Sequence, residues 1–211
     1  MAKLAETSIQ KPLSHREKLI RVGTQQLYAY GFHGTTVDRI LEASGVPKGS
    51  FYHHFHSKEK FAKEALDRYI RFQFDLLARW AGKDDLDTAD VITGYFNDMA
   101  VAFTRSRYQR ACLVGKLSTE MAATSPAFRE VLAADIEQWK AKIVELLQRG
   151  RDRGDVYEGI TIDEMADTVL ALIQGAFVLV LASRNDAMLD ATRTALRLLV
   201  VGPRSVVSST E

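Results

Sequence analysis

The sequence is poor in cysteine and proline and has no long hydrophobic run. Its single cysteine, Cys112, cannot form a disulfide within the chain, so we expect packing to hold the fold, as in proteins of a reducing compartment. The longest apolar stretch, residues 176–182, is far shorter than the roughly 20 residues that cross a bilayer, and residues 1–13 lack the apolar core of a signal peptide. We therefore expect a cytoplasmic protein with no membrane partner.

The charges are unevenly distributed along the chain. Residues 1–60 contain nine Lys and Arg against five Asp and Glu, a net charge of +4, whereas the rest contains nineteen against twenty-two, a net charge of −3. All five histidines also lie in the first 60 residues. A basic, histidine-rich segment suits a polyanion such as DNA, although the excess is small and counts only together with a motif.

Strand-like alternation is almost absent, whereas helix start and stop signals recur along the chain. Ser14 with Glu17 and Thr161 with Glu164 form capping boxes, and Pro47 stands where a first helical turn accepts proline. We expect an all-α protein of about nine helices, over residues 14–31, 35–45, 47–55, 57–80, 88–104, 112–123, 125–150, 161–183 and 187–201. The expected domains are 1–60, with a flexible arm at 1–13, and 61–202, followed by a tail at 203–211.

The first domain has the pattern of a helix-turn-helix. Thr35, with Asp38 three residues on, opens a short helix that stops at Gly45, and a second short helix runs from Pro47 to Phe55. A recognition helix of about seven residues is roughly 10 Å long and fits a major groove about 12 Å wide. This pattern predicts an N-terminal three-helix DNA-binding domain.

The same segment resembles the DNA-binding domain of the TetR family over roughly residues 15–61. The resemblance depends on residues 31–32, 35–37, 40, 43–46, 48–55 and 57–59, which combine turn glycines with an aromatic signature. Gly23 departs from the usual alanine, and Pro47 from the usual serine cap. The resemblance implies a C-terminal helical domain that binds an effector and dimerises.

The expected DNA contacts cluster at the recognition helix and its neighbours. Small and polar side chains at the start of this helix are suited to base edges, and Phe51 and Phe55 are expected to point inward. The resemblance adds phosphate contacts, two of them near the N-terminus of the next helix. The complete predicted set is Thr35, Thr36, Lys48, Gly49, Ser50, Tyr52, His53, His54 and Lys58.

Neither a cofactor nor a catalytic site is expected. The chain has no phosphate-binding glycine loop and no nucleophile elbow, and residues 61–211 have no set of carboxylates and histidines at metal-binding spacing. His53, His54 and His56 point in different directions on a helix, and no second ligand cluster follows them, so we expect no zinc site. The sequence thus favours a regulator over an enzyme.

Residues of about 162–201 are expected to form a homodimer interface. A single helix-turn-helix reads too few base pairs, and two recognition helices about 34 Å apart read a palindrome. The last two helices have more apolar positions than a monomer buries, and Ala171 and Gly175 would permit close approach. The apolar positions are Val169, Leu172, Ile173, Ala176, Phe177, Val180, Leu181, Leu189, Ala195, Leu196 and Leu199.

Helices four to eight hold enough aromatic and methionine residues to line an effector pocket, although periodicity cannot distinguish such a pocket from filled core. These residues are Phe72, Phe74, Trp80, Tyr95, Phe96, Met99, Phe103, Met121 and Trp139. Cys112 lies in a segment, 110–118, similar to the cysteine-bearing stretch of electrophile-sensing members of the family. Lys116, Arg110 and a helix N-terminus would lower the pKa of the Cys112 thiol. A buried, unreactive cysteine is an equally open interpretation.

These patterns together predict a sequence-specific repressor that a small-molecule effector, with an electrophile at Cys112 as one candidate, releases from palindromic operator DNA. The helix at 57–80 would couple the two domains, because one end contacts the DNA-binding domain and the other the pocket. Two alternatives stay open, namely a DNA-binding protein that needs no ligand and an activator of the same fold. The effector, the operator sequence and the regulated genes are not predictable from this sequence.

Overall fold

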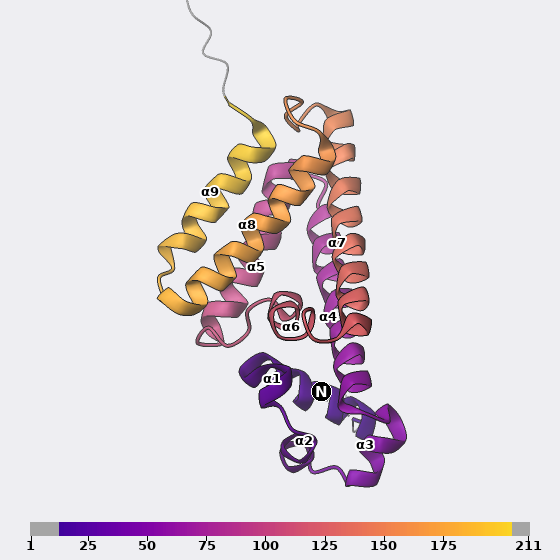
Figure 1. Ribbon diagram of the computed structural model, residues 1–211. Helices are drawn as coiled ribbons and strands as arrows, with labels where there is room; N and C mark the ends of the chain where they lie inside the picture. Colours follow the sequence, from indigo (N-terminus) through magenta and orange to yellow (C-terminus); the bar gives the residue numbers. More distant parts are fainter. Residues whose placement is uncertain (1–12, 204–211) are drawn as a thin grey trace, which may run out of the picture.

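The computed structural model describes residues 13–203, so the expected arm and tail lie outside the described residues except for Leu13 and Pro203. The described part contains nine α-helices and no strand. Three short-to-medium helices, α1 (His15–Gly34), α2 (Val37–Ser44) and α3 (Lys48–Phe55), form a small head at one end (Figure 1). The body consists of α4 (Lys58–Ala81), α5 (Thr88–Arg105), α6 (Leu113–Met121), α7 (Pro126–Arg153), α8 (Ile162–Ser183) and α9 (Ala187–Val201).

The predicted capping boxes at Ser14 and Thr161 are confirmed. Each hydroxyl accepts from the N–H of the glutamate three residues on, and the side chain of that glutamate accepts from the backbone N–H of the cap residue. Ser57 likewise caps α4, with its hydroxyl accepting from the Lys60 N–H. These local hydrogen bonds satisfy donors that a helix N-terminus leaves open, each stabilising the helix by about 1 kcal/mol.

Two predicted helix ends are wrong. The N-cap of α2 is Thr36, whose hydroxyl accepts from the Arg39 N–H, and not Thr35. Gly31 does not end α1 but interrupts it, with φ 70° and ψ −173°, and the helix resumes as far as Gly34. Both errors come from tertiary contacts, because the chain around Gly31 and Thr35 is shaped by its packing against the body.

Phe61 joins the head to the body. It is fully buried at the start of α4, and its ring centroid lies 5.4 Å from that of Phe51 and 5.0 Å from that of Phe55, both on α3. A methyl group at Gly23 would lie 2.1 Å from the tip of the Phe61 ring, so the glycine at this position makes room for the ring. The head therefore packs on the first turn of α4, which continues unbroken into the body (Figure 1).

In the body, α4 and α7 lie side by side along most of their length, while α5, α8 and α9 form the other flank (Figure 1). By length and composition α8 could cross a membrane, with a mean hydropathy of 2.0 in its most apolar window. One such helix is weak evidence for a membrane span, because core helices pass the same test. Here α8 packs against α7 and α9, and the Phe177 ring contacts the rings of Phe96 and Phe103 of α5.

Asp135 on α7 gives the fold a pH dependence. One of its carboxylate oxygens is buried without a hydrogen-bond partner among the described residues. Burial raises the pKa of Asp135 from 3.8 to about 6, and the nearby Asp67 adds to the shift. The folded chain therefore binds the proton of the Asp135 carboxyl more tightly than the unfolded chain does. The stability that this protonation contributes is fully present below about pH 4 and is lost as the pH rises through about 6.

We accordingly expect Asp135→Asn to stabilise the protein at pH 8 by about 1 kcal/mol, discounted for solvent screening because the carboxyl is partly exposed. At pH 4 the variant and the wild type should unfold alike. Thermal denaturation at both pH values measures the difference, and Asp84→Asn, at an exposed loop position, is the control. An equal gain at both pH values would contradict the assignment.

Candidate functional site

The outer surface of α3 presents the predicted recognition residues to solvent. Lys48, Gly49, Tyr52 and His53 are exposed, whereas the ring of Phe51 is fully buried, as predicted, and so is that of Phe55. The Lys48 ammonium lies 3.1 Å from the Asp38 carboxylate of α2, and this hydrogen bond raises the pKa of Lys48. The pair joins the two helices of the motif at the exposed surface.

The N-terminus of α3 is open. Pro47 is its N-cap and has no side-chain cap hydrogen bond, and the Ser50 N–H donates to the Pro47 carbonyl at 3.0 Å. The Ser50 hydroxyl lies 3.3 Å from Nδ1 of His15, which belongs to the first turn of α1. Backbone N–H groups at a helix start favour anions, so this end of α3 is suited to phosphate or base-edge acceptors.

Two residues of the predicted DNA-contact set are engaged inside the protein. Thr35 is fully buried and donates its hydroxyl to the Gly31 carbonyl at 2.7 Å, so its side chain has no surface for DNA. The Lys58 ammonium donates to the carbonyls of Phe32 and Thr35 at 3.0 and 3.1 Å and lies 4.2 Å from the centroid of the Phe32 ring. Lys58 therefore anchors the end of α1 to α4.

Cys112 lies near the junction of body and head, at the N-cap of α6, and is 5% exposed. Its sulfur accepts hydrogen bonds from the Tyr69 hydroxyl of α4 at 3.3 Å and from the Gln174 amide of α8 at 3.0 Å. The other amide atom of Gln174, Oε1, is buried with no partner among the described residues. One thiol thus connects three helices.

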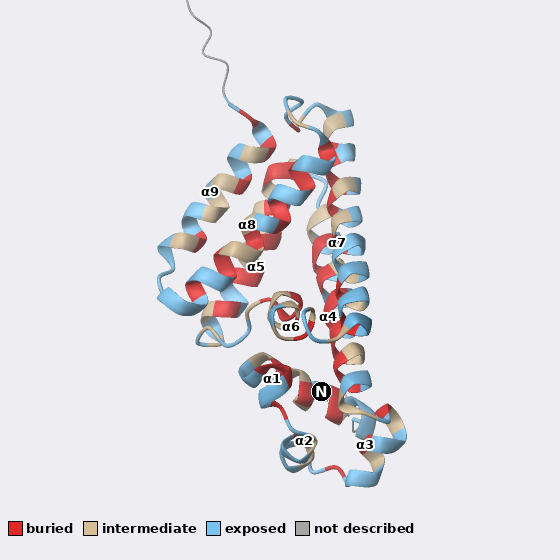
Figure 2. Ribbon diagram, in the orientation of Figure 1, coloured by how far each residue is buried: buried red, intermediate tan, exposed pale blue. Residues whose placement is uncertain are grey.

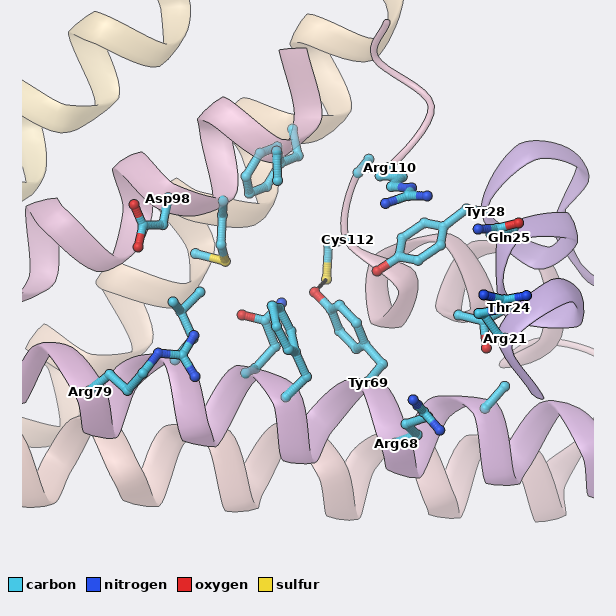
Figure 3. Close-up of a pocket in the computed structure, with 18 residues that line it drawn as sticks. Arg21, Thr24, Gln25, Tyr28, Arg68, Tyr69, Arg79, Asp98, Arg110 and Cys112 are labelled. Atoms are coloured by element: carbon cyan, nitrogen blue, oxygen red, sulfur yellow. Dashed lines mark hydrogen bonds between the residues drawn. The ribbon is translucent and has the colours of Figure 1, made fainter. Parts of the chain in front are cut away.

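Two cavities meet at Cys112. The larger, of about 510 Å³, lies among α1, α4, α5 and the segment before α6, and the smaller, of about 330 Å³, opens between α6 and α8. Figure 3 shows Cys112 near the middle of the larger cavity, with Tyr28 and Tyr69 beside it. Both volumes suit small organic molecules, and both give access to the sulfur.

The tyrosines around the sulfur remain hydrogen-bond donors. Burial raises the pKa of Tyr28, Tyr69 and Tyr95 above the usual 10.0, and the neighbouring Cys112 raises each of them further. Their hydroxyls therefore stay protonated at any physiological pH. The Tyr95 hydroxyl donates to Gln73 at 2.9 Å, which places a second polar pair beside the cavity.

Helix α6 holds the head through two side chains. The Lys116 ammonium donates to the Tyr28 carbonyl at 2.7 Å, and the Glu120 carboxylate accepts from the His33 N–H at 3.1 Å. The Lys116 ammonium is therefore hydrogen-bonded to α1, and its predicted effect on the Cys112 thiol stays a prediction. Because Lys116 and Glu120 follow Cys112 by one and two turns, we call these two hydrogen bonds the α6 clasp.

The exposed surface of α8 and α9 includes large apolar side chains. Val178, Leu179 and Leu198 are 55%, 53% and 60% exposed, and Gly175 has open space where a side chain would lie. Figure 2 shows exposed and intermediate stretches along most of α9. Most of the positions predicted for the interface are instead core of the single chain: Val169, Ile173, Ala176, Phe177, Val180, Leu189 and Leu196 are buried.

Comparison with known proteins agrees with this geometry. Residues 19–65 match the profile described as bacterial regulatory proteins, tetR family, and residues 90–196 match that of the Tetracyclin repressor-like C-terminal domain. The chain belongs to the TetR family. The two matches cover the head and most of the body, so the nine-helix, all-α architecture predicted from the sequence is confirmed as a TetR fold.

TetR-family regulators similar to this chain include two named repressors. The HTH-type transcriptional repressor DhaR of Mycobacterium sp. (strain GP1) is 30% identical over 83% of this chain and 86% of its own length. NemR of Escherichia coli (strain K12) is 30% identical over 65% of this chain and 69% of its own length. The crystal structure of the reduced form of E. coli NemR superposes with a TM-score of 0.79 at 26% identity, covering 90% of this chain and 100% of the NemR chain. A TetR regulatory protein from Rhodobacter sphaeroides gives a TM-score of 0.81 at 27% identity, covering 87% and 97%.

Sequence reasoning missed much of the cavity of this TetR-family chain. Of the aromatic and methionine residues predicted to line it, Phe72 and Met99 do so, whereas Tyr95, Phe96 and Trp139 belong to the buried core. The missed residues come largely from α1 and from polar positions of α4, where an exposed arginine or glutamine gives no periodic signal. They include Arg21, Thr24, Gln25, Tyr28, Arg68, Tyr69, Gln73, Arg79 and Arg110.

Proposed function

We propose that the protein is a TetR-family repressor that binds palindromic operator DNA as a homodimer and leaves it when an effector occupies the Cys112 cavities. The observation that carries this proposal is the position of Cys112, whose sulfur connects α4, α6 and α8 while α6 holds the DNA-binding head. As a protein that acts on the chromosome, it would work in the cytoplasm.

The DNA contacts would come from the exposed surface of the head. Lys48, Gly49, Ser50, Tyr52 and His53 project from α3 toward the major groove, with the N-terminus of α3 open to acceptors. Thr36, His54 and the third donor of Lys58 are proposed as phosphate contacts. The domain boundary near residue 60 falls within the first turn of α4, so a rotation of α4 would move the head as a unit.

The dimer would form through α8 and α9. The exposed apolar side chains of these helices need cover, and their small neighbours allow two copies to approach closely. Packing against the same helices of a second chain gives a four-helix bundle, the arrangement by which two heads reach successive major grooves. We place the exposed side chains at this interface and the buried ones in the core of each chain.

The effector chemistry would be alkylation of Cys112 by an electrophile that enters either cavity. In the addition of a thiol to an activated alkene, a bond forms between Sγ of Cys112 and the β-carbon of the alkene, the alkene π bond breaks, and the thiol proton ends on the alkene's α-carbon, so no oxidant is needed. The adduct occupies the space in which Tyr69 and Gln174 donate to the sulfur. Both hydrogen bonds are then lost, and α4 and α8 shift relative to α6.

The shift would reach the DNA through the α6 clasp. Any movement of α6 acts on α1 through Lys116 and Glu120, which bond to the backbone of Tyr28 and His33. Operator DNA and the adduct favour different spacings of the two heads, so the adduct lowers the population that can bind. The effector cavities and the head would thus be coupled both through α4, as predicted, and through the contact of α6 with α1.

The experiment that tests this function is a mobility shift with DNA from the protein's own promoter region, with and without N-ethylmaleimide. We expect the reagent to lower operator affinity of the wild type at least about 10-fold, the size of a typical allosteric coupling, and to leave Cys112→Ser bound. Mass spectrometry of the treated protein verifies a single adduct.

Each other outcome removes a stated part of the proposal. Release of both proteins by the reagent would exclude Cys112 as the sensor. Specific binding that the reagent never changes would leave a repressor of noncovalent ligands, and the absence of specific binding to any promoter fragment would overturn the repressor itself.

A further inference from the structure

The larger cavity has an unbalanced charge. Its lining includes four arginines, Arg21, Arg68, Arg79 and Arg110, but only one carboxylate, that of Asp98. Within the described chain, none of these four guanidinium groups has a carboxylate or carbonyl hydrogen-bond partner. Four solvent-exposed cations therefore converge on one concave space with a single carboxylate in its lining.

Neighbouring arginines on the same helices are paired. Arg16 of α1 forms an ion pair with Glu64, and Arg71 of α4 forms one with Asp67. Both of these arginines lie outside the cavity lining, whereas Arg21 and Arg68 lie in it and form no ion pair with another described residue. The absence of acidic partners is thus a property of the cavity and not of the two helices.

The arginines divide into two groups. In the view of Figure 3, Arg79 lies with Asp98 at one end of the cavity, where the carboxylate offsets its charge. At the other end, Arg21 of α1, Arg68 of α4 and Arg110 of the segment between α5 and α6 lie beyond the cysteine, with no carboxylate in the lining. Three separate segments therefore contribute positive charge to one end.

Like charges raise the energy of this end, and an anion would lower it. Two unit charges 4 Å apart interact by about 1 kcal/mol in bulk water and several times more near a protein surface. The planar guanidinium fork matches the oxygen pairs of carboxylate, sulfonate and phosphate groups. Between the charged ends, Phe72, Met99 and Phe177 give the cavity an apolar wall.

We propose that Arg21, Arg68 and Arg110 form an anion subsite, and that the effector is an organic anion with an apolar body that extends toward Cys112. That the occupant is the effector rests on the function proposed above, whereas the subsite rests on the arginines alone. Arg21 belongs to α1, Arg68 to α4, and Arg110 to the segment between α5 and α6. An anion held by all three therefore bridges the DNA-binding head to the body.

The subsite is tested with a matched pair of fluorescent probes. Anilinonaphthalene sulfonate has an apolar body and one negative charge, and phenylnaphthylamine has the same ring system without the sulfonate. We expect the sulfonate to bind the full-length protein about 10-fold more tightly than the neutral probe, and Arg68→Gln or Arg110→Gln to reduce its affinity about 10-fold. Neutral-probe binding should not change in either variant, nor sulfonate binding in the control Arg71→Gln.

Two results would overturn the subsite. The first is equal binding of the two probes, or sulfonate binding that neither Arg68→Gln nor Arg110→Gln reduces. The second is a loss of operator affinity in these variants with unchanged sulfonate binding, which would make the arginines phosphate contacts of the DNA. Circular dichroism confirms that each variant is folded.

A second readout joins the subsite to the cysteine. Iodoacetate and iodoacetamide alkylate a thiol in the same way: the S–C bond forms, the C–I bond breaks, iodide leaves and the thiol proton passes to buffer. Positive charge beside Cys112 should raise the rate of iodoacetate relative to iodoacetamide, and Arg110→Gln should lower that ratio about 10-fold. If Cys112 reacts with neither reagent, the electrophile mechanism fails, while the probe titration still decides the subsite.

Discussion

The double variant Leu179→Glu/Leu198→Glu is expected to be a folded monomer that has lost operator binding by about 100-fold or more. Both leucines are more than half exposed on the single chain, so the substitutions leave the core of each protomer intact. In a two-fold interface each glutamate occurs twice, and burying four unpaired carboxylates costs far more than a tight dimer gains. A single head then lacks the second half-site.

Light scattering after size exclusion measures the dimer, and a mobility shift measures DNA binding. The control is Ile136→Glu, which introduces the same charge at an exposed apolar position on α7, outside α8 and α9. The control should remain dimeric and bind DNA. A double variant that stays dimeric would place the interface elsewhere and leave the apolar surface of α8 and α9 without an explanation.

Gly31→Ala is expected to destabilise the protein by about 3 kcal/mol. The φ of 70° and ψ of −173° belong to a backbone region that only glycine adopts readily, and forcing a side chain into it costs about 1–3 kcal/mol. A methyl group there would also lie 1.7 Å from a Glu120 carboxylate oxygen, so Glu120 must leave and release the His33 N–H. Urea denaturation measures the loss.

Two further variants separate the backbone strain from the lost contact. Gly45 also has a positive φ, of 65°, but nothing lies within 4 Å of a methyl group there, so Gly45→Ala should cost only about 1 kcal/mol. Glu120→Ala removes half of the α6 clasp without strain and should fall between the two. If Gly31→Ala unfolds no more easily than Gly45→Ala, the contact between Gly31 and Glu120 contributes nothing.

The features that the sequence predicts well are those decided within a few residues. Ser14, Ser57 and Thr161 cap their helices through side chains that bond three residues ahead, and such contacts are visible in the sequence. The helix-turn-helix and the inward direction of Phe51 and Phe55 follow from the same local spacing. The sequence predicts Thr35 as the start of α2, but the buried Thr35 hydroxyl donates to the Gly31 carbonyl and Thr36 caps the helix instead.

The candidate site depends on contacts that local spacing cannot reveal. The donors to the Cys112 sulfur, Tyr69 and Gln174, are 43 and 62 residues away in the chain. The anion subsite likewise combines exposed arginines from α1, α4 and the segment between α5 and α6. None of these positions has a local sequence signal that marks it as part of a site. The sequence shows that α8 and α9 have more apolar side chains than a monomer buries. It does not show which of these side chains are already buried within the single chain.

The α6 clasp has a consequence for the cell as a whole. In the proposed mechanism, the α6 clasp couples the effector site to the head, and thermodynamic linkage requires that an effector which weakens operator affinity by some factor bind the operator-bound dimer more weakly by that same factor. Copies of the regulator that are free in the cell therefore capture the effector first. The promoter-bound copy is released only after this reserve is occupied, so the number of regulator molecules per promoter sets the concentration at which the gene responds.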